Sequence, residues 1–276
     1  MINKLGLLML NVFFIIVCFF TLIPILYAFS VSLNASGGLL GANFSFVPRD
    51  FTFQHYRAII FDQPVLLWFR NTAILAVSAV CITLLISVPG AYSLSRFRFR
   101  GRQSVINMLL LLHAFPAILS MFAIFRLMSP MGLVNTRLGL VIVYIGTMSV
   151  FGLLNLKGYF SSIPVEIEEA ASIDGANAWQ TITKILLPLS RPAIIVTGVM
   201  VMIFVWNEYI FAITFMTGAA NYTLSAGLYS LQATDMTGSW PVFAAASIVV
   251  SLPILIIFFA TQRYMTSGLT AGGVKG

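Results

Sequence analysis

The sequence predicts an all-α membrane protein, a bundle of about six transmembrane helices, and three observations lead to this prediction. Of the 276 residues, 59% are hydrophobic. Only 8% are charged, against about 25% in an average soluble domain. Apolar runs of the length that spans a bilayer, about 20 residues, recur along the chain. There is too little polar side chain to cover a water-facing surface, so the predicted solvent is lipid.

Six apolar runs are long enough to cross a membrane. They are residues 7–30, 72–94, 105–127, 138–160, 192–215 and 241–261. The first follows Lys4, as in a signal peptide, but its length favours a retained span. Each proline inside these runs is predicted to bend its helix, because it removes a backbone donor. These prolines are Pro24, Pro89, Pro116 and Pro253.

The basic residues act as topology signals. The formal net charge is +7, but the cations lie between apolar runs, which argues against a nucleic-acid-binding face. Arginines at 96, 98, 100 and 102 follow the second span, and Arg263 and Lys275 follow the last. Because loops rich in Lys and Arg stay in the cytoplasm, both termini are predicted to be cytoplasmic. The alternation of Arg and Phe over residues 96–100 predicts a juxtamembrane anchor at lipid phosphates.

The sequence carries no pattern for catalysis or for metal binding. Cys18 and Cys81 lie inside predicted spans without metal-ligand spacing, so we expect small packing residues. The phosphate-binding pattern GxxxxGKS/T is absent, as are HExxH and a Ser/His arrangement. An intramembrane enzyme is therefore disfavoured, and no metal or cofactor is expected on this chain.

One cytoplasmic segment, residues 161–191, breaks the apolar pattern. It holds the acidic cluster Glu166, Glu168, Glu169 and Asp174. A serine at 161 or 162, with Pro164 in the first turn, predicts the start of a short amphipathic helix. Gly175 permits a turn. A second apolar-faced helix is then predicted from residues at helical spacing: Trp179, Ile182, Ile185 and Leu186.

Two interpretations of the short helix remain open from composition alone. A small face made by Ala170, Ala171 and Ile173 suits insertion into a groove of a partner protein. The alternative is a solvated helix that lies on the membrane surface.

The same segment resembles a known family. Its pattern is that of the EAA loop, EAA-x3-G-x9-I-x-L-P, in the membrane subunits of ABC importers, and the matching residues are Glu169, Ala170, Ala171, Gly175, Ile185, Leu187 and Pro188. Residues 98–101, 114–117, 157–160, 206–209 and 268–276 resemble carbohydrate permeases of the MalG type. The resemblance covers nearly the whole chain and implies one permease domain, 1–276, with the type I importer (MetI-like) fold.

The resemblance implies three contact regions for partner proteins. The EAA helix, with Asp174 beside the motif, implies docking to a separate ATPase. The tail 263–276, through Thr270, Gly272, Gly273 and Lys275, implies a second ATPase contact, where composition alone predicts a disordered end. The flexible outer loop, with Thr217, Gly218, Asn221 and Tyr222, implies contact with a binding protein, or is an ordinary connector.

The resemblance also implies the assembly in which the chain works. It implies a second, MalF-like permease, two MalK-like ATPase subunits and an extracytoplasmic sugar-binding protein in the inner cell membrane. ATP and Mg²⁺ belong to the ATPase subunits, so this chain is a transport subunit and not an enzyme.

Two ionisable residues in predicted spans need separate interpretation. Glu208 falls about 16 residues into its span, roughly 24 Å along a helix, and intramembrane charges usually face a cavity. We expect a pathway or gate role for Trp206, Asn207, Glu208 and Tyr209, or else a position at the outer interface. For His113 we expect a hydrogen bond inside the bundle rather than a proton relay.

The substrate expected from the resemblance is maltose or a maltodextrin, and the alternative is another oligosaccharide or a glycerol-phosphate-type molecule. An ion-coupled secondary transporter is the rival from another class. It should carry ionisable residues near the membrane midplane and repeated broken helices, and little beyond His113 fits that description.

Overall fold

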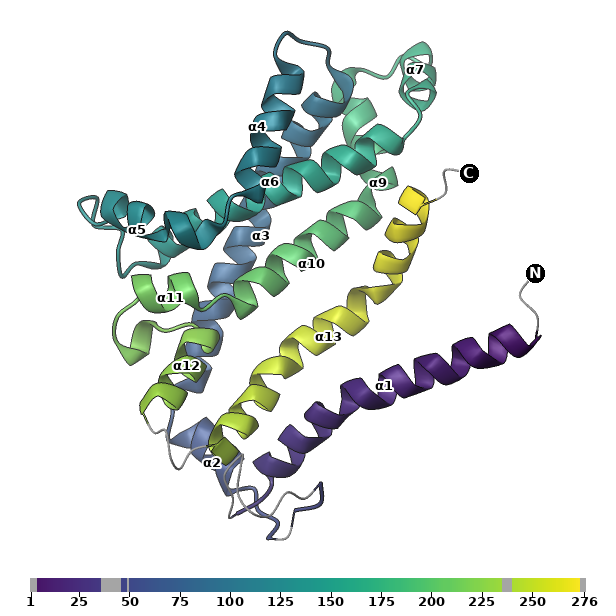
Figure 1. The fold of residues 1–276 in the computed structure, drawn as a ribbon. Coiled ribbons are helices and arrows are strands. Elements are labelled where there is room, and N and C mark those ends of the chain that lie inside the picture. The colour runs from purple at the N-terminus through teal and green to yellow at the C-terminus, as the bar shows by residue number, and fades with distance from the viewer. Residues whose placement is uncertain (1–3, 36–45, 49, 235–239, 274–276) are drawn as a thin grey trace. The chain divides into compact units, whose positions relative to one another are not determined.

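The computed structural model describes residues 4–35, 46–48, 50–234 and 240–273, and all regular structure in these ranges is helical apart from one isolated bridge between Asn34 and Phe51. The longer helices are α1 (Lys4–Ser32), α3 (Val65–Arg96), α6 (Arg137–Ser162), α10 (Arg191–Asn207) and α13 (Trp240–Gly273) (Figure 1). The shorter ones are α2 (Gln54–Phe61), α4 (Arg102–Ala114), α5 (Ala117–Met128), α7 (Glu166–Ile173), α8 (Ala178–Gln180), α9 (Leu187–Leu189), α11 (Ile210–Phe215) and α12 (Leu224–Thr234), with a π-helix η1 (Thr181–Leu186) and a 3-10 turn η2 (Ala219–Asn221). The all-α prediction is confirmed.

The predicted number of spans is reached only if two bent helix pairs count as one span each. Within the described residues, α1, α3, α6 and α13 are each long and apolar enough to cross a membrane. The other two candidates are α4 with α5, bent by 95°, and residues 178–189 with α10, bent by 71°. By length and composition, the described residues thus contain four continuous candidate spans and two bent ones.

The third predicted span, residues 105–127, is broken rather than bent. Helix α4 ends at Ala114, Phe115 and Pro116 are extended, and α5 begins at Ala117. Pro116 cannot donate a backbone hydrogen bond to α4. The other three prolines in spans lie inside continuous helices.

The fifth predicted span, residues 192–215, is also interrupted. Helix α10 ends at Asn207, Glu208 is extended with a ψ of 122°, and α11 begins at Ile210. Glu208 thus occupies a break between two helices, which corrects its predicted place inside a continuous one.

The contacts divide the chain into two compact units, Met1–Leu67 with Gly227–Leu252 and Trp68–Ala226 with Pro253–Gly276. In the first unit, the end of α1 is joined to α2. The hydroxyls of Ser32 and Tyr56 lie 2.7 Å apart, and His55 Nε2 lies 3.1 Å from the carbonyl oxygen of Asn34. The single permease domain expected from the sequence stays a prediction.

The second unit has its core where α3, α6, α10 and α11 meet. One buried cluster includes Leu75, Leu140, Tyr144, Val201 and Phe215. A second cluster joins α3, α6, η1 and α10 through Ala91, Leu156, Phe160, Leu186 and Ala193. Cys81 of α3 is exposed, as is Cys18 of α1, so neither is the packing residue that we expected within this chain.

Helices α3 and α6 approach closely at Gly152. A Cβ atom at this position would lie 2.7 Å from Ser87 Oγ and 3.3 Å from Thr83 Cγ2. Ser87 in turn donates to the carbonyl of Ser149, at 3.2 Å. Small residues at such a crossing let two membrane helices pack backbone to backbone.

We expect Gly152→Ala to lower the free energy of unfolding by about 1–3 kcal/mol, the range for overpacked cores. The matched control is Gly158→Ala in the same helix, where the new Cβ meets no neighbouring atom within 4 Å and alanine is the better helix former. Thermal unfolding in detergent measures both variants. Equal midpoints would contradict the close crossing of α3 and α6.

Candidate coupling interface and membrane cavity

The predicted amphipathic helix is present as α7, but it begins later than expected. Ser161 and Ser162 are the last residues of α6, and α7 follows Val165, which provides no side-chain cap. Three glutamates occupy the first turn of α7. Negative side chains are favoured there because the helix N-terminus carries partial positive charge.

The EAA residues of α7 do not share one environment. Glu169, Ala170, Asp174 and Gly175 are exposed, whereas Ala171 is buried against the chain's own structure. Ile173 is 87% exposed although it is a large apolar residue. The outward surface of α7 therefore combines a carboxylate, a small residue and an unpartnered aliphatic side chain.

Gly175 ends α7 in a left-handed conformation, with a φ of 86°. The amide of Ala176 donates to the carbonyl of Ala171 at 2.9 Å, and that of Gly175 donates to Ser172 at 3.1 Å. This is the usual way in which a glycine ends a helix. The turn predicted at Gly175 is confirmed.

The second half of the loop is helical, with a π-helical turn at η1. Leu186 is 1% exposed, Ile185 and Leu187 are half-buried, and Pro188 is exposed. Trp179 is 71% exposed, so its predicted place on the inward apolar face is wrong. The most buried of these side chains belongs to Leu186, which the motif leaves unspecified.

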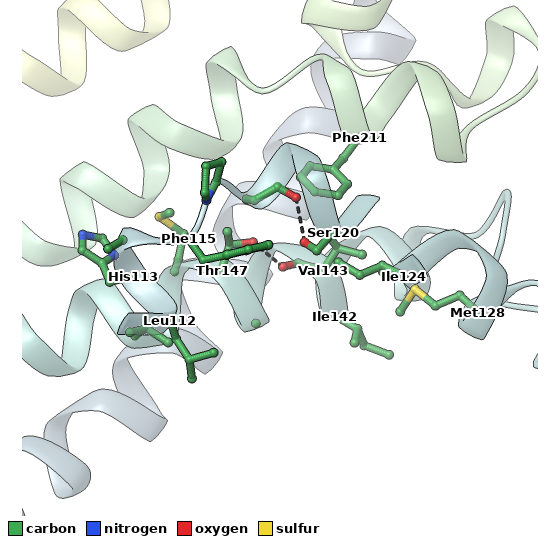
Figure 2. Close-up of a pocket in the computed structure, with 16 residues that line it drawn as sticks. Leu112, His113, Phe115, Ser120, Ile124, Met128, Ile142, Val143, Thr147 and Phe211 are labelled. Atoms are coloured by element: carbon green, nitrogen blue, oxygen red, sulfur yellow. Dashed lines mark hydrogen bonds between the residues drawn. The ribbon is translucent and has the colours of Figure 1, made fainter. Parts of the chain in front are cut away.

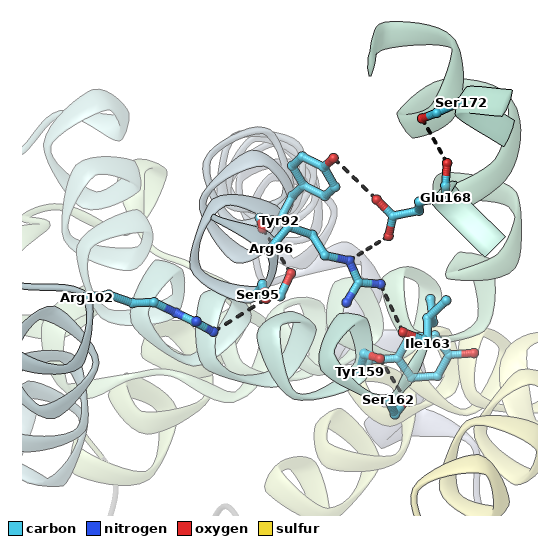
Figure 3. A network of polar contacts seen from close by, with 9 residues as sticks. All are labelled: Tyr92, Ser95, Arg96, Arg102, Tyr159, Ser162, Ile163, Glu168 and Ser172. Atoms are coloured by element: carbon cyan, nitrogen blue, oxygen red, sulfur yellow. Dashed lines mark hydrogen bonds and ion pairs between the residues drawn. The ribbon is translucent and has the colours of Figure 1, made fainter. Parts of the chain in front are cut away.

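A polar network ties α7 to the end of α3 (Figure 3). Arg96 Nε donates to Glu168 Oε1 at 2.5 Å, and Arg96 Nη2 donates to the carbonyl of Ile163 at 3.0 Å. The Arg96 and Glu168 side chains are only 9% and 12% exposed. The prediction that Arg96 is a lipid anchor is therefore wrong, whereas Arg98 and Arg100 are exposed.

This pair could have been suspected from the sequence only by matching opposite charges on the same predicted side of the membrane. Arg96 follows one span, and Glu168 follows another. No spacing rule joins two residues so far apart in the chain, so sequence analysis missed the contact.

Glu208 closes the break between α10 and α11. Its Oε1 accepts the N–H of Phe211 at 2.8 Å, and its Oε2 accepts the N–H of Ala212 at 3.2 Å. The buried hydroxyl of Tyr144 on α6 donates to Oε2 at 2.9 Å. Three hydrogen-bond donors thus offset part of the free-energy cost of placing this carboxylate in a membrane segment.

The other three predicted pathway residues diverge from Glu208. Trp206 is buried with its ring 5.6 Å from that of Phe69. Asn207 is exposed and donates to the carbonyl of Ile203 at 2.8 Å, and Tyr209 is exposed. These residues do not converge on one cavity.

A cavity of about 800 Å³ lies instead at the break between α4 and α5 (Figure 2). Its walls come from α4, α5 and α6, with Phe211 of α11. The polar side chains among the mainly apolar lining are His113, Ser120 and Thr147. The His113 side chain makes no hydrogen bond to the described residues, so its predicted bond inside the bundle is not found there; its ring lies 6.2 Å from that of Phe151.

The broken helix adds backbone polarity to this cavity. Part of the backbone at this break is already paired, because the N–H of Phe115 donates to the carbonyl of Leu111 at 3.1 Å and that of Leu119 donates to the carbonyl of Pro116 at 3.0 Å. The other end groups are those that a helix leaves without an intrahelical partner. Ser120 and Thr147 donate their hydroxyl protons to the carbonyls of Ala117 and Val143. Each hydroxyl oxygen can still accept a hydrogen bond, so the cavity offers both donors and acceptors to a polar guest.

The predicted outer contact loop makes hydrogen bonds to other parts of the chain, and its flexibility stays a prediction. It contains Thr217, Gly218, Asn221 and Tyr222. Asn135 Oδ1 accepts the N–H of Thr217 at 2.9 Å and Nδ2 of Asn221 at 3.1 Å. Asn71 Nδ2 of α3 donates to the carbonyl of Tyr222 at 3.0 Å.

The predicted tail begins inside the last helix. Helix α13 continues through Gly273, so Thr270, Gly272 and Gly273 are helical rather than part of a disordered end. Lys275 lies outside the described residues.

Comparison with known proteins identifies similar permeases. The family described as "Binding-protein-dependent transport system inner membrane component" matches residues 84–270. The chain is 34% identical over 275 residues to the maltose/maltodextrin transport system permease protein MalG of Photorhabdus laumondii, which covers 92% of this chain and 91% of that protein. It is 32% identical over 256 residues to the galactooligosaccharides transport system permease protein GanQ of Bacillus subtilis, with 92% and 90% covered.

A solved structure has the same fold over almost the whole chain. It is that of a bacterial ABC transporter involved in the import of the acidic polysaccharide alginate, with a TM-score of 0.78 and 26% identity. The match covers 96% of this chain and 99% of that chain.

We expect Glu208→Gln to lower the free energy of unfolding by about 1–3 kcal/mol, because the amide nitrogen cannot accept one of the three hydrogen bonds. Tyr144→Phe alone should cost about 1 kcal/mol. Denaturant unfolding in detergent of both single variants and the double variant measures the coupling. Additive costs would contradict a direct bond between the two side chains.

Proposed function

The chain belongs to the family of binding-protein-dependent transport system inner membrane components, the membrane subunits of ABC importers, and we propose that it carries an oligosaccharide, with maltose or a maltodextrin as first candidate. It is the permease subunit of an importer for sugars in the inner membrane. It is not an enzyme, because ATP hydrolysis in these importers belongs to separate ATPase subunits. This proposal rests mainly on the exposed surface of α7, which carries Glu169, Ala170 and Ile173.

The docking of an ATPase subunit uses this surface of α7 and the turn at Gly175. Glu169 offers a carboxylate, Ala170 allows close approach, and Ile173 offers an apolar side chain that the chain itself leaves exposed. A short amphipathic helix of this kind fits a groove on a partner. Ile185, Leu187 and Pro188 support it from the second half of the loop.

The orientation follows from the basic residues after the second span. With α7 and the Arg98 and Arg100 loop on the cytoplasmic side, both termini are cytoplasmic. The loop with Thr217 and Tyr222 then faces the extracytoplasmic binding protein. Its hydrogen bonds to Asn135 and Asn71 give that surface a defined shape.

The cavity at the break between α4 and α5 forms this chain's part of the sugar path. Irregular backbone at membrane depth is tolerated where it lines a water-filled space or is covered by protein. The free helix ends together with Ser120, Thr147 and His113 supply the hydrogen bonds that a hydrated sugar exchanges. Phe115 and Phe211 supply ring surface.

The complete transporter contains further subunits. A second, MalF-like permease completes the path, two MalK-like ATPases bind ATP and Mg²⁺, and an extracytoplasmic protein delivers the sugar. The helical end at Thr270, Gly272 and Gly273, followed by Lys275, forms a second ATPase contact.

The choice of sugar is supported by the resemblance to maltose/maltodextrin permeases. A relative of similar identity is named for galactooligosaccharides, which makes another oligosaccharide the second candidate. Uptake of labelled maltotriose by the assembled transporter, in competition with unlabelled galactobiose, separates the two. If unlabelled galactobiose abolishes the uptake of labelled maltotriose but unlabelled maltotriose does not, the maltodextrin assignment is rejected.

For the docking proposal, we expect Gly175→Val to reduce nucleotide-driven uptake. The left-handed backbone costs a residue with a side chain roughly 1–2 kcal/mol, a factor of about 5–30 in an equilibrium. Uptake into liposomes and co-purification of the ATPase measure the effect. Gly158→Val is the control, and a wild-type rate for Gly175→Val would contradict the docking role of the turn.

For the cavity, we expect Gly146→Leu to slow sugar uptake by roughly tenfold or more, a loss in the range for a blocked apolar pocket. Gly146 lines the cavity, and an added Cβ meets no neighbouring atom within 4 Å, so the larger side chain fills space without forcing α6 to move. Gly158→Leu, outside the cavity on the same helix, is the matched control. If both variants transport sugar equally fast, the path does not pass here.

A further inference from the structure

The Arg96–Glu168 ion pair joins the end of α3 to α7, the helix that carries the EAA residues. Arg96 is the last residue of α3, and Glu168 lies in the first turn of α7. The guanidinium uses Nε for the carboxylate and Nη2 for the carbonyl of Ile163, the residue that caps α6. Tyr92 Oη, one turn earlier on α3, lies 3.4 Å from the second carboxylate oxygen. One arginine thus connects three elements (Figure 3).

The burial of this pair separates it from the other charges of the same loop. Both side chains are almost fully covered, whereas the neighbouring Arg98 and Arg100 are exposed. An exposed ion pair contributes little. Separating a covered pair is costly, because each charge would be left uncompensated. The planar guanidinium also fixes the direction of the contact as well as its distance.

Helix α3 is in turn in close contact with two other helices. At Gly90, an added Cβ would lie 3.0 Å from Leu153 of α6, and at Gly198 of α10 it would lie 3.4 Å from Leu84. Together with the crossing at Gly152, these contacts leave α3 little room to slide independently of α6 and α10. A displacement of the end of α3 is therefore passed into the bundle.

We propose that Arg96 and Glu168 form a latch, a side-chain contact that makes the end of α3 move together with α7. When the ATPase moves α7, the movement then reaches the transmembrane helices through this contact as well as through the covalent chain. This inference rests on the proposed function, because it deepens the role of α7. Arg96 and Glu168 act as positioning residues. They contact neither the sugar nor the nucleotide.

The test uses the whole transporter in liposomes, with its second permease, ATPase subunits and binding protein. We compare R96Q, E168Q and the exchanged pair R96E/E168R, with R98Q as the exposed control from the same loop. The single variants should lower sugar uptake per ATP hydrolysed by between about 5- and 150-fold, the range of coupling between linked sites. The exchanged pair should regain part of this ratio, because the ion pair is restored but the bond to the Ile163 carbonyl is not. R98Q should match the wild type.

A second measurement does not depend on a variant of the pair. Spin labels at cysteines introduced for the exposed residues Arg100 and Glu166, with Cys18 and Cys81 replaced by serine, report the distance between the α3 end and α7. A latch keeps this distance the same in the nucleotide-free and vanadate-trapped states. A change between the two states would overturn the proposal.

The uptake ratios give the other decisive outcomes. The proposal is also wrong if R96Q keeps the wild-type uptake per ATP, or if the folded exchanged pair is no better than the single variants. Failure of the proposed function has a different signature, since the wild-type complex would then show no nucleotide-driven sugar uptake at all.

Discussion

In the hydrocarbon core of a membrane, a backbone N–H or C=O group that loses its helical partner must find another one in protein or in trapped water. This constraint applies to two breaks in the described chain, the one between α10 and α11 and the one between α4 and α5. At the break between α10 and α11, the Glu208 carboxylate accepts two N–H groups of α11 and the Tyr144 hydroxyl. At the break between α4 and α5, the helix ends face a cavity instead. Side chains satisfy the backbone at the first break, whereas at the second break part of the backbone lines a cavity.

Charged residues are scarce in this chain, and four of its acidic residues have distinct environments. Only eight acidic residues occur in the sequence. Glu208 closes a break, and Glu168 pairs with Arg96 in the ion pair found among the described residues. Glu169 and Asp174 stay exposed on the coupling loop. These four acids thus either pair with polar groups inside the protein or lie exposed on its surface.

Residues of the EAA motif that are adjacent in the sequence occupy different environments in the structure. The two alanines of the EAA motif are adjacent in sequence, yet Ala170 is exposed and Ala171 is buried. Successive residues on a helix point about 100° apart, so one alanine packs inward and the other faces out. Gly175 then ends the helix in a conformation that disfavours other residues. The motif therefore combines a residue packed within this chain with residues that stay exposed on its surface.

The membrane environment, the six apolar segments, the short helix with its turn at Gly175, and the family could all be predicted from the sequence. These features depend on local composition and fixed spacing, because hydrophobic length and helix termination act within a few residues. The sequence could not determine that Pro116 breaks its span while Pro89 does not, that Trp179 faces outward, or that Arg96 pairs with Glu168. Those outcomes depend on which helices meet in three dimensions. They are visible in the folded chain alone, because burial and side-chain pairing are set by neighbours far away in the sequence.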